Sequence, residues 1–161
     1  MTPTARSRIM RAIKKQDTRP EIAVRKMLHA MGYRFRLHRS DLPGTPDIVL
    51  PGRRTVVFVH GCFWHQHPGC AKGRMPTSRQ DYWQPKLLRN VARDTTAKAE
   101  LEQAAWKVTV VWECELADLD SVRERLASTI PTRTSAVVGK LWDCPGSDTA
   151  GEVVRLRLAC P

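Results

Sequence analysis

The sequence contains no long hydrophobic run, and none of its apolar segments approaches the roughly 20 residues that a membrane-spanning helix requires. Residues 1–15 are basic and polar, without the apolar segment of a secretory signal. We therefore expect a cytoplasmic protein with no membrane segment. Because disulfides are rare in that compartment, the five cysteines are expected to be thiols or metal ligands. The 161 residues fit one domain, and 42% hydrophobic content suffices for a core.

Acidic residues are scarce in the first quarter of the chain. Residues 1–40 hold eleven Lys or Arg against two acids, a net charge of +9, whereas residues 41–161 contribute only +2 of the total of +11. Such a lopsided excess indicates a polyanionic partner. A solvated basic face or an RNA-binding protein would also fit, but nucleic-acid binding of some kind is the better interpretation.

Hydrophobic periodicity predicts the element order αα-βββ-α-β-α, hence an α/β fold with a mixed sheet flanked by helices. Residues 61–77 form a long loop without periodicity, and a loop of that length usually needs a function or a metal to fix it. Residues 131–161 are read as a poorly organised tail with a strand at 153–158. The expected helices are 4–13, 18–31, 78–105 (interrupted near Pro85) and 118–130, and the expected strands are 33–38, 46–50, 55–60 and 107–113.

Cysteine and histidine gather in the loop. Cys62, His67 and Cys70 lie within nine residues, and Cys114 follows a later strand. Zinc takes four such ligands in a tetrahedron, so three close ligands and one distant ligand predict a structural zinc site. His65 could replace His67, because spacing alone does not decide between them. Scattered thiols and a surface histidine are the alternative, and Cys144 and Cys160 in the tail are left out of the site.

Acidic and histidine side chains are placed near the ends of two expected strands. Asp47 begins one strand and His60 ends the next, with His65 five residues later. Imidazole has a pKa suited to taking a proton from water, so these histidines could serve as a base. The plainer interpretation is that each histidine belongs to the core and that Asp47 forms a turn. Glu21 stands near a helix start, where its negative charge interacts favourably with the helix dipole. Asp94 is either a solvated helix carboxylate or a group that orients a histidine.

Aromatic residues follow the first cysteine of the loop. Phe63 and Trp64 stand among polar residues, where an apolar pair suits a wedge inserted between base steps of DNA. Trp83, at the start of a basic helical region, suits a wedge or the core equally. Trp106 and Trp112 are expected in the core.

Together these residues resemble one family, the very short patch repair (Vsr) DNA mismatch endonucleases, over about residues 5–130. The His60-Gly-Cys-Phe-Trp-His65 string is the most specific part of the resemblance. The other matching strings are Asp17 to Glu21, Arg36 to Arg39, Asp41 to Gly44, Pro46 to Val49, Val57 to Val59, Asn90 to Asp94 and Val111 to Cys114.

The resemblance implies a restriction-endonuclease-like fold in residues 1–130, with residues 1–19 gripping the duplex and 131–161 as a tail. It implies a monomeric enzyme that cuts 5′ to the thymine of a T:G mismatch, which forms when 5-methylcytosine is deaminated. The cut starts very short patch repair, and mismatch-repair proteins are the implied partners. The implied site comprises Asp47 and the Val59 carbonyl as magnesium ligands, His65 as general base with Asp94, His60 and Glu21 in support, Cys62, His67, Cys70 and Cys114 as zinc ligands, and Phe63, Trp64 and Trp83 as the wedge.

Two positions depart from the family pattern. The segment between His67 and Cys70 is a residue longer than the family form, and Val59 stands where a threonine occurs. The second change is harmless if only the backbone carbonyl binds metal. A zinc-stabilised nucleic-acid-binding module without catalysis is the main alternative, and it would leave Asp47, His65 and Glu21 incidental. A nuclease of the His-metal-finger type is the weakest, because its Asn-His companion pattern is missing.

Overall fold

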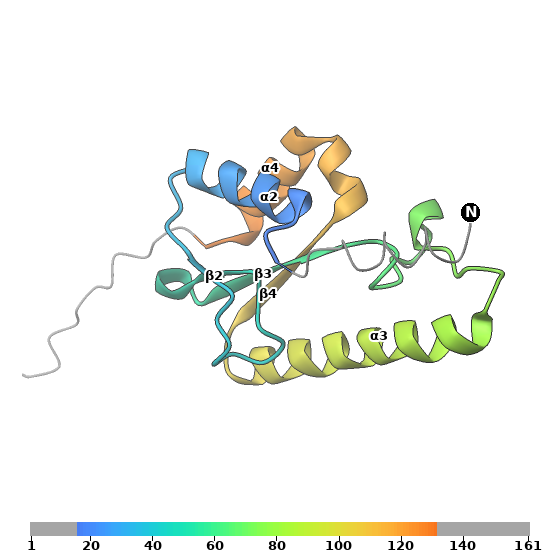
Figure 1. Cartoon of the computed structure of the whole chain (residues 1–161). Coiled ribbons are helices and arrows are strands. Elements are labelled where there is room, and N and C mark those ends of the chain that lie inside the picture. The colour runs from blue at the N-terminus through green and yellow to red at the C-terminus, as the bar shows by residue number, and fades with distance from the viewer. Residues whose placement is uncertain (1–15, 132–161) are drawn as a thin grey trace, which may run out of the picture.

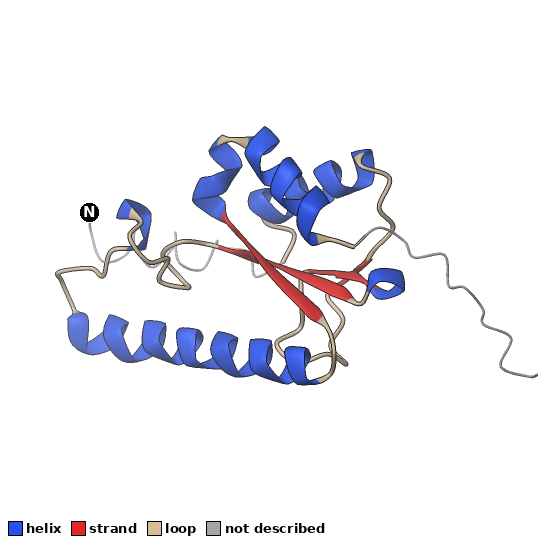
Figure 2. Ribbon diagram, turned by 180° about the vertical axis from the view of Figure 1, so that it is seen from behind, coloured by secondary structure: helices blue, strands red, loops and turns tan. Residues whose placement is uncertain are grey.

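The computed structural model describes residues 16–131, in which four strands form one mixed sheet (Figure 2). The strands are β1 (Arg36–Leu37), β2 (Ile48–Leu50), β3 (Thr55–His60) and β4 (Lys107–Trp112), and they lie in that order across the sheet. β1, β2 and β3 are antiparallel neighbours, whereas β3 and β4 run parallel, with His60 opposite Trp112. The parallel pair therefore ends at one edge of the sheet, where the loop after His60 begins.

Helices cover both faces of this sheet (Figure 1). α2 (Arg19–Ala30) and α4 (Leu119–Thr129) lie on one face, and the long α3 (Gln80–Gln103) lies on the other. Short 3-10 helices occupy Pro51–Arg53, Ala71–Gly73 and Glu113–Ala117. The main core, on the α2 and α4 side, comprises Val24, Met27, Leu28, Tyr33, Ile48, Leu50, Val57, Val111, Val122, Leu126 and Ile130. A smaller cluster faces α3 and comprises Val49, Val56 and Leu101 with Leu42, Phe58, Trp106 and Val108 around it.

α2 begins and ends where the sequence predicts. Thr18 is the N-cap of a capping box with Glu21, and Pro20 stands in the first turn, where its missing N–H costs nothing. After the helix, Gly32 adopts a φ of +80°, a backbone conformation that glycine reaches without a Cβ clash. This sharp stop turns the chain toward the buried Tyr33 and the first strand.

Two element predictions are wrong in part. The strand expected at 33–38 is reduced to Arg36–Leu37, both exposed, because this edge strand pairs with β2 at only two positions. The helix expected to break near Pro85 is continuous. Proline cannot donate to the carbonyl of Asp81, but that carbonyl lies in the exposed first turn, where water can replace the lost bond.

Several expectations fall outside the described residues: the helix at 4–13, most of the basic region 1–19, the strand at 153–158, Cys144 and Cys160. Within residues 16–131, no helix is both long and apolar enough to cross a membrane.

Candidate active site

Asp47 stands immediately before β2, beside the end of β3. Its Oδ2 accepts a hydrogen bond of 2.8 Å from the N–H of Val59, which fixes the carboxylate at this edge of the sheet. Burial raises the pKa of Asp47 from 3.8 to about 6, although the Val59 N–H lowers it, and the nearby Glu21 charge raises it further. A buried carboxylate that is costly to ionise gains from a cation beside it, and oxygen donors are those that Mg²⁺ prefers.

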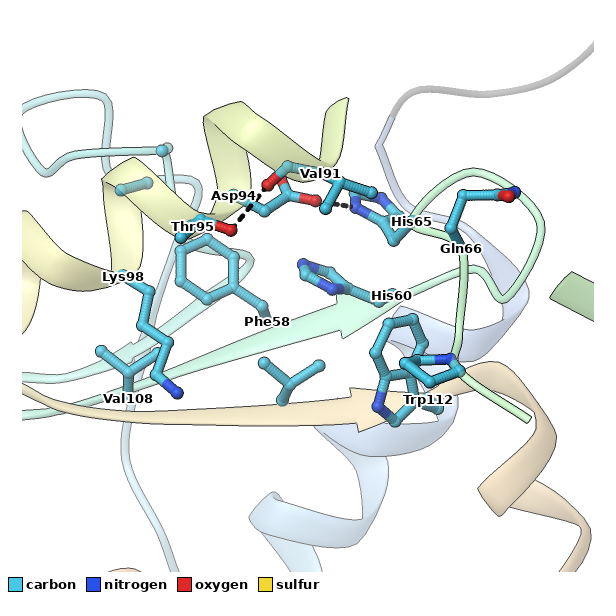
Figure 3. Close-up of a pocket in the computed structure, with 14 residues that line it drawn as sticks. Phe58, His60, His65, Gln66, Val91, Asp94, Thr95, Lys98, Val108 and Trp112 are labelled. Atoms are coloured by element: carbon cyan, nitrogen blue, oxygen red, sulfur yellow. Dashed lines mark hydrogen bonds and ion pairs between the residues drawn. The ribbon is translucent and has the colours of Figure 1, made fainter. Parts of the chain in front are cut away.

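Two histidines are stacked at the end of β3. His60 is the last residue of β3, and its ring lies parallel to that of His65, with centroids 3.8 Å apart and an interplanar angle of 9°. His65 Nδ1 contacts the carboxylate of Asp94 on α3 (Figure 3). Asn90, one turn earlier on α3, donates to the Trp64 carbonyl at 3.2 Å. The helix therefore holds the loop, and the Asp94 contact orients the His65 ring through Nδ1.

His60 differs from His65 in its surroundings. It is buried, and burial lowers its pKa to about 4, with the charge of His65 acting in the same direction. The imidazole is therefore neutral near pH 7. A cavity of about 240 Å³ opens between the sheet and α3 beside both histidines (Figure 3). Its remaining wall is mostly apolar, with Phe58, Val91 and Val108 among the lining residues.

The predicted metal ligands come together on the other side of the loop. The ligand atoms of Cys62, His67, Cys70 and Cys114 all lie within 4.8 Å of one another. His67 Nδ1 is 3.2 Å from the Cys114 sulfur and 3.7 Å from the Cys62 sulfur. With zinc–sulfur bonds near 2.3 Å and zinc–nitrogen bonds near 2.1 Å, such separations suit a tetrahedral ion. This group could hold a metal, and it contains His67 rather than His65, which the sequence left open.

Two thiols of this cluster differ in their electrostatic surroundings. Cys62 is fully buried, and burial raises the pKa of its thiol to about 12. The backbone N–H of Lys72 has the opposite effect on Cys70, lowering the pKa of that thiol. The longer segment between His67 and Cys70 does not remove Cys70 from the group. It closes as a turn in which Cys70 N–H donates to the His67 carbonyl at 3.3 Å.

The three aromatic residues considered for a wedge form one cluster. The ring of Trp83 lies edge-on to that of Phe63 at 5.4 Å and tilted to that of Trp64 at 6.0 Å, while Phe63 and Trp64 are 5.1 Å apart. Trp83 is only 5% exposed, whereas Phe63 and Trp64 are half-buried. Lys86 adds a positive charge 5.4 Å from the Trp64 ring. The cluster joins the loop to the start of α3.

Glu21 lies in a network that sequence reasoning did not find as a whole. Its carboxylate accepts hydrogen bonds from Thr18 Oγ1 at 2.8 Å, the N–H groups of Asp17 and Thr18, and Arg25 Nη2 at 2.6 Å. Arg25 also donates to His38 Nε2 at 2.9 Å and to Asp17. Arg25 stands four residues after Glu21, a helical spacing that favours an ion pair, and this was the signal available in the sequence.

Trp106 and Trp112, both expected in the core, are half-buried and differ in their neighbours. Trp106 packs against the smaller core cluster. Trp112 belongs to neither core cluster of residues 16–131 and instead stacks on His67, with ring centroids 4.1 Å apart. No spacing in the sequence indicates that contact.

Comparisons with known proteins agree on one family. A family model described as DNA mismatch endonuclease Vsr matches residues 1–72. Type II nicking enzyme V.XorIIP of Xanthomonas oryzae pv. oryzae is 55% identical over 130 residues, which cover 81% of this chain and 95% of that protein. DNA mismatch endonuclease Vsr of Escherichia coli is 41% identical over 111 residues, covering 69% of this chain and 70% of that protein.

Among solved structures, the catalytic domain of homing endonuclease I-Bth0305I has a TM-score of 0.50 at 21% identity. The similarity covers 70% of this chain and 94% of that one, and it concerns the fold alone. The expected mixed α/β architecture is thereby confirmed, with an endonuclease domain as its structural neighbour.

Proposed function

Because this chain belongs to the Vsr family of DNA mismatch endonucleases, whose relatives nick DNA, we propose that it cuts one strand 5′ to the thymine of a T:G mismatch. Such mismatches arise when 5-methylcytosine is deaminated, and the nick would initiate very short patch repair. The observation that carries the proposal is the His65–Asp94 pair, stacked on a neutral His60 at the strand end that also binds Asp47. This arrangement supports the assignment of His65 as the base and of Asp47 as the carboxylate that binds the cation, both near the end of β3.

In the proposed reaction, His65 Nε2 takes a proton from a water molecule as the water oxygen bonds to phosphorus and the bond from phosphorus to the leaving oxygen breaks. The leaving oxygen takes a proton from solvent and departs as a hydroxyl group. Asp94 then stabilises the imidazolium through Nδ1, and the neutral His60 ring fixes the plane of His65. Asp47 and the Val59 carbonyl would hold Mg²⁺, which supplies charge neutralisation at the phosphate when bound. Glu21, whose carboxylate already accepts four hydrogen bonds, supports the site through Arg25 and His38.

The metal of the cysteine cluster is proposed to be structural zinc. All four ligand positions come from the protein, through Cys62, His67, Cys70 and Cys114, and a closed tetrahedral set leaves no position for substrate. The ion would therefore fix the shape of the loop, and Mg²⁺ would serve the cut.

Mismatch recognition is assigned to the aromatic cluster. Phe63 and Trp64 would enter the base stack, with Trp83 as the more buried third member of the wedge. Residues 1–19, rich in Lys and Arg, would grip the duplex, and residues 1–130 would act as one catalytic domain.

A panel of labelled duplexes tests this function. Each duplex carries one mismatch in varied flanking sequence, and the full chain is incubated with it in Mg²⁺. We expect a single nick 5′ to the thymine of T:G and intact T:A and C:G controls. Asp47→Ala should bind the T:G duplex but leave it uncut. An intact T:G duplex in every context, with folded and metal-loaded protein, would contradict the proposal and favour a binding module.

A further inference from the structure

Trp112 lies between the cysteine cluster and the stacked histidines. It is the last residue of β4 and is paired in register with His60, the last residue of β3, so both side chains point to the α3 face of the sheet. Its ring is parallel to that of His67, with centroids 4.1 Å apart and an interplanar angle of 8°. It meets the His60 ring edge-on at 5.3 Å and 74°. The rings of His67, Trp112, His60 and His65 therefore form a continuous contact path.

The histidine pair has little other support on this side. The cavity of about 240 Å³ borders His60 and His65, so part of their surface faces this cavity rather than packed side chains (Figure 3). Phe58 is the other aromatic neighbour of His60, at 5.7 Å and a tilt of 48°. Trp112 is the neighbour that also touches a metal ligand, and it lines the same cavity.

The position of Trp112 is itself well defined. The backbone N–H of Trp112 donates to Glu115 Oε2 at 2.7 Å, and Arg125 donates to the same oxygen at 2.6 Å. Arg125 also donates to the Val110 carbonyl at 3.2 Å, which ties this end of β4 to α4. Cys114 follows two residues later, so the metal cluster constrains the chain on the other side of the tryptophan. The backbone of Trp112 is thus fixed by hydrogen bonds, and its ring is fixed by stacking on His67.

We propose that Trp112 is a positioning residue: it transmits the fixed position of His67 in the metal cluster to His60, and through His60 it keeps the His65 ring aligned with Asp94. The inference rests on the proposed nicking function for its kinetic consequences. Its structural content, the orientation of His65, can be measured without DNA. The role differs from core packing, because Trp112 lies outside both core clusters of the described residues.

The test compares Trp112→Leu and Trp112→Phe in the full, zinc-loaded chain. Trp112→Leu should keep one metal per chain and an unchanged KM for the T:G duplex, but lower kcat about 100-fold, the effect of a small misplacement of a catalytic group. Trp112→Phe retains a ring face toward His67 and should restore most of that loss. If Trp112→Leu does not fold, Trp112→Met replaces it, since methionine fills the space without a flat face.

Histidine-ring nitrogen NMR of the DNA-free protein gives an independent readout. The wild type should show a single His65 tautomer with its proton on Nδ1, toward Asp94, and Trp112→Leu should show both tautomers. Trp106→Leu is the matched control, because it removes a half-buried tryptophan just before the same strand without touching a histidine. It should lower stability but leave kcat and the His65 tautomer unchanged.

Three results would overturn the proposal: wild-type kcat in Trp112→Leu, a single His65 tautomer in that variant, or loss of metal in proportion to loss of rate. If the wild type itself does not nick T:G duplexes, the proposed function fails. The tautomer experiment then still decides whether Trp112 positions His65.

Discussion

At the scale of single residues, side chains of the same type have different surroundings in this site. His60 and His65 are stacked, yet one is buried and neutral and the other has a carboxylate partner on one nitrogen. Asp47 and Asp94 differ in the same way, since Asp47 contacts a backbone N–H and Asp94 contacts an imidazole. Environments of this kind suit the two members of each pair to the different roles proposed for them, although the side chains look equivalent in the sequence.

The Asp47 environment predicts a conflict between stability and function. The folded pKa of about 6 exceeds the ordinary 3.8, so the buried charge destabilises the metal-free fold above pH 6, and this cost disappears below about pH 4. Asp47→Asn keeps an oxygen for the Val59 N–H. We expect it to raise the free energy of unfolding by up to about 3 kcal/mol at pH 7 without magnesium. Nicking should be abolished.

Urea denaturation at several pH values measures this effect. The difference between Asp47→Asn and wild type should shrink steadily as the pH falls from 6 to 4, which are the bounds set by the pKa of Asp47. Equal stabilities at neutral pH would show that the carboxylate carries no desolvation cost.

His65 and Asp94 are expected to act as a pair. His65→Ala should lower kcat by about 10²–10⁴-fold, the usual contribution of a general base, and added imidazole should recover part of the rate. Asp94→Asn should also lower kcat, because an amide does not stabilise the imidazolium. Asp81→Asn, an exposed change on the same helix, is the control. A rate drop no larger in Asp94→Asn than in this control would remove Asp94 from the mechanism.

At the scale of elements, α3 is the support on which the loop after β3 rests. Asn90 and Asp94 fix the loop from one face of this helix, and Trp83 packs under Phe63 and Trp64 near its start. A regular helix keeps these contacts in a fixed relation along its length. The continuous course of α3 past Pro85 therefore fixes the proposed wedge relative to the proposed base.

Pro85 offers a way to test the helix by itself. Pro85→Ala restores an N–H that can donate to the Asp81 carbonyl, so we expect the free energy of unfolding to rise by roughly 1–2 kcal/mol, less than the full interior penalty of proline. Thermal unfolding of Pro85→Ala beside Gln84→Ala, a neighbouring exposed change, measures it. A lower stability for Pro85→Ala would mean that proline gains more by restricting the unfolded chain than it loses in the helix.

At the scale of the whole molecule, much of the fold could be predicted because the signals were local. The capping box at Thr18, the apolar run of β3 and the spacing of Cys62, His67 and Cys70 each depend on near neighbours in the sequence. The choice between His65 and His67 could not be predicted, since Asp94 stands 29 residues from His65 and decides it through tertiary contact. The Arg25–His38 bond and the short β1 depend in the same way on pairing across the fold.

The uneven charge of the chain predicts how DNA binding depends on salt. Residues 1–15 carry five Lys or Arg and no acid, whereas residues 132–161 carry four bases and three acids. The logarithm of the DNA-binding constant falls linearly with the logarithm of the salt concentration. Removing residues 1–15 should make this slope less steep by roughly 4, about 0.9 for each lost phosphate contact. Fluorescence anisotropy over a salt series measures the slope. Removing residues 132–161 is the control and should leave it unchanged.

The position of Cys114 links the stability of the fold to the supply of metal. The cysteine cluster joins Cys62 to Cys114 across the whole of α3 and β4, so the complete set of four ligands exists only in the folded chain, and the proposed zinc ion would bind the folded chain more tightly than the unfolded one. By mass action, each tenfold rise in free zinc above the dissociation constant then adds about 1.4 kcal/mol to the folded state. If the proposed zinc ion is the one bound, the amount of folded chain, and with it the proposed nicking activity, would follow zinc supply.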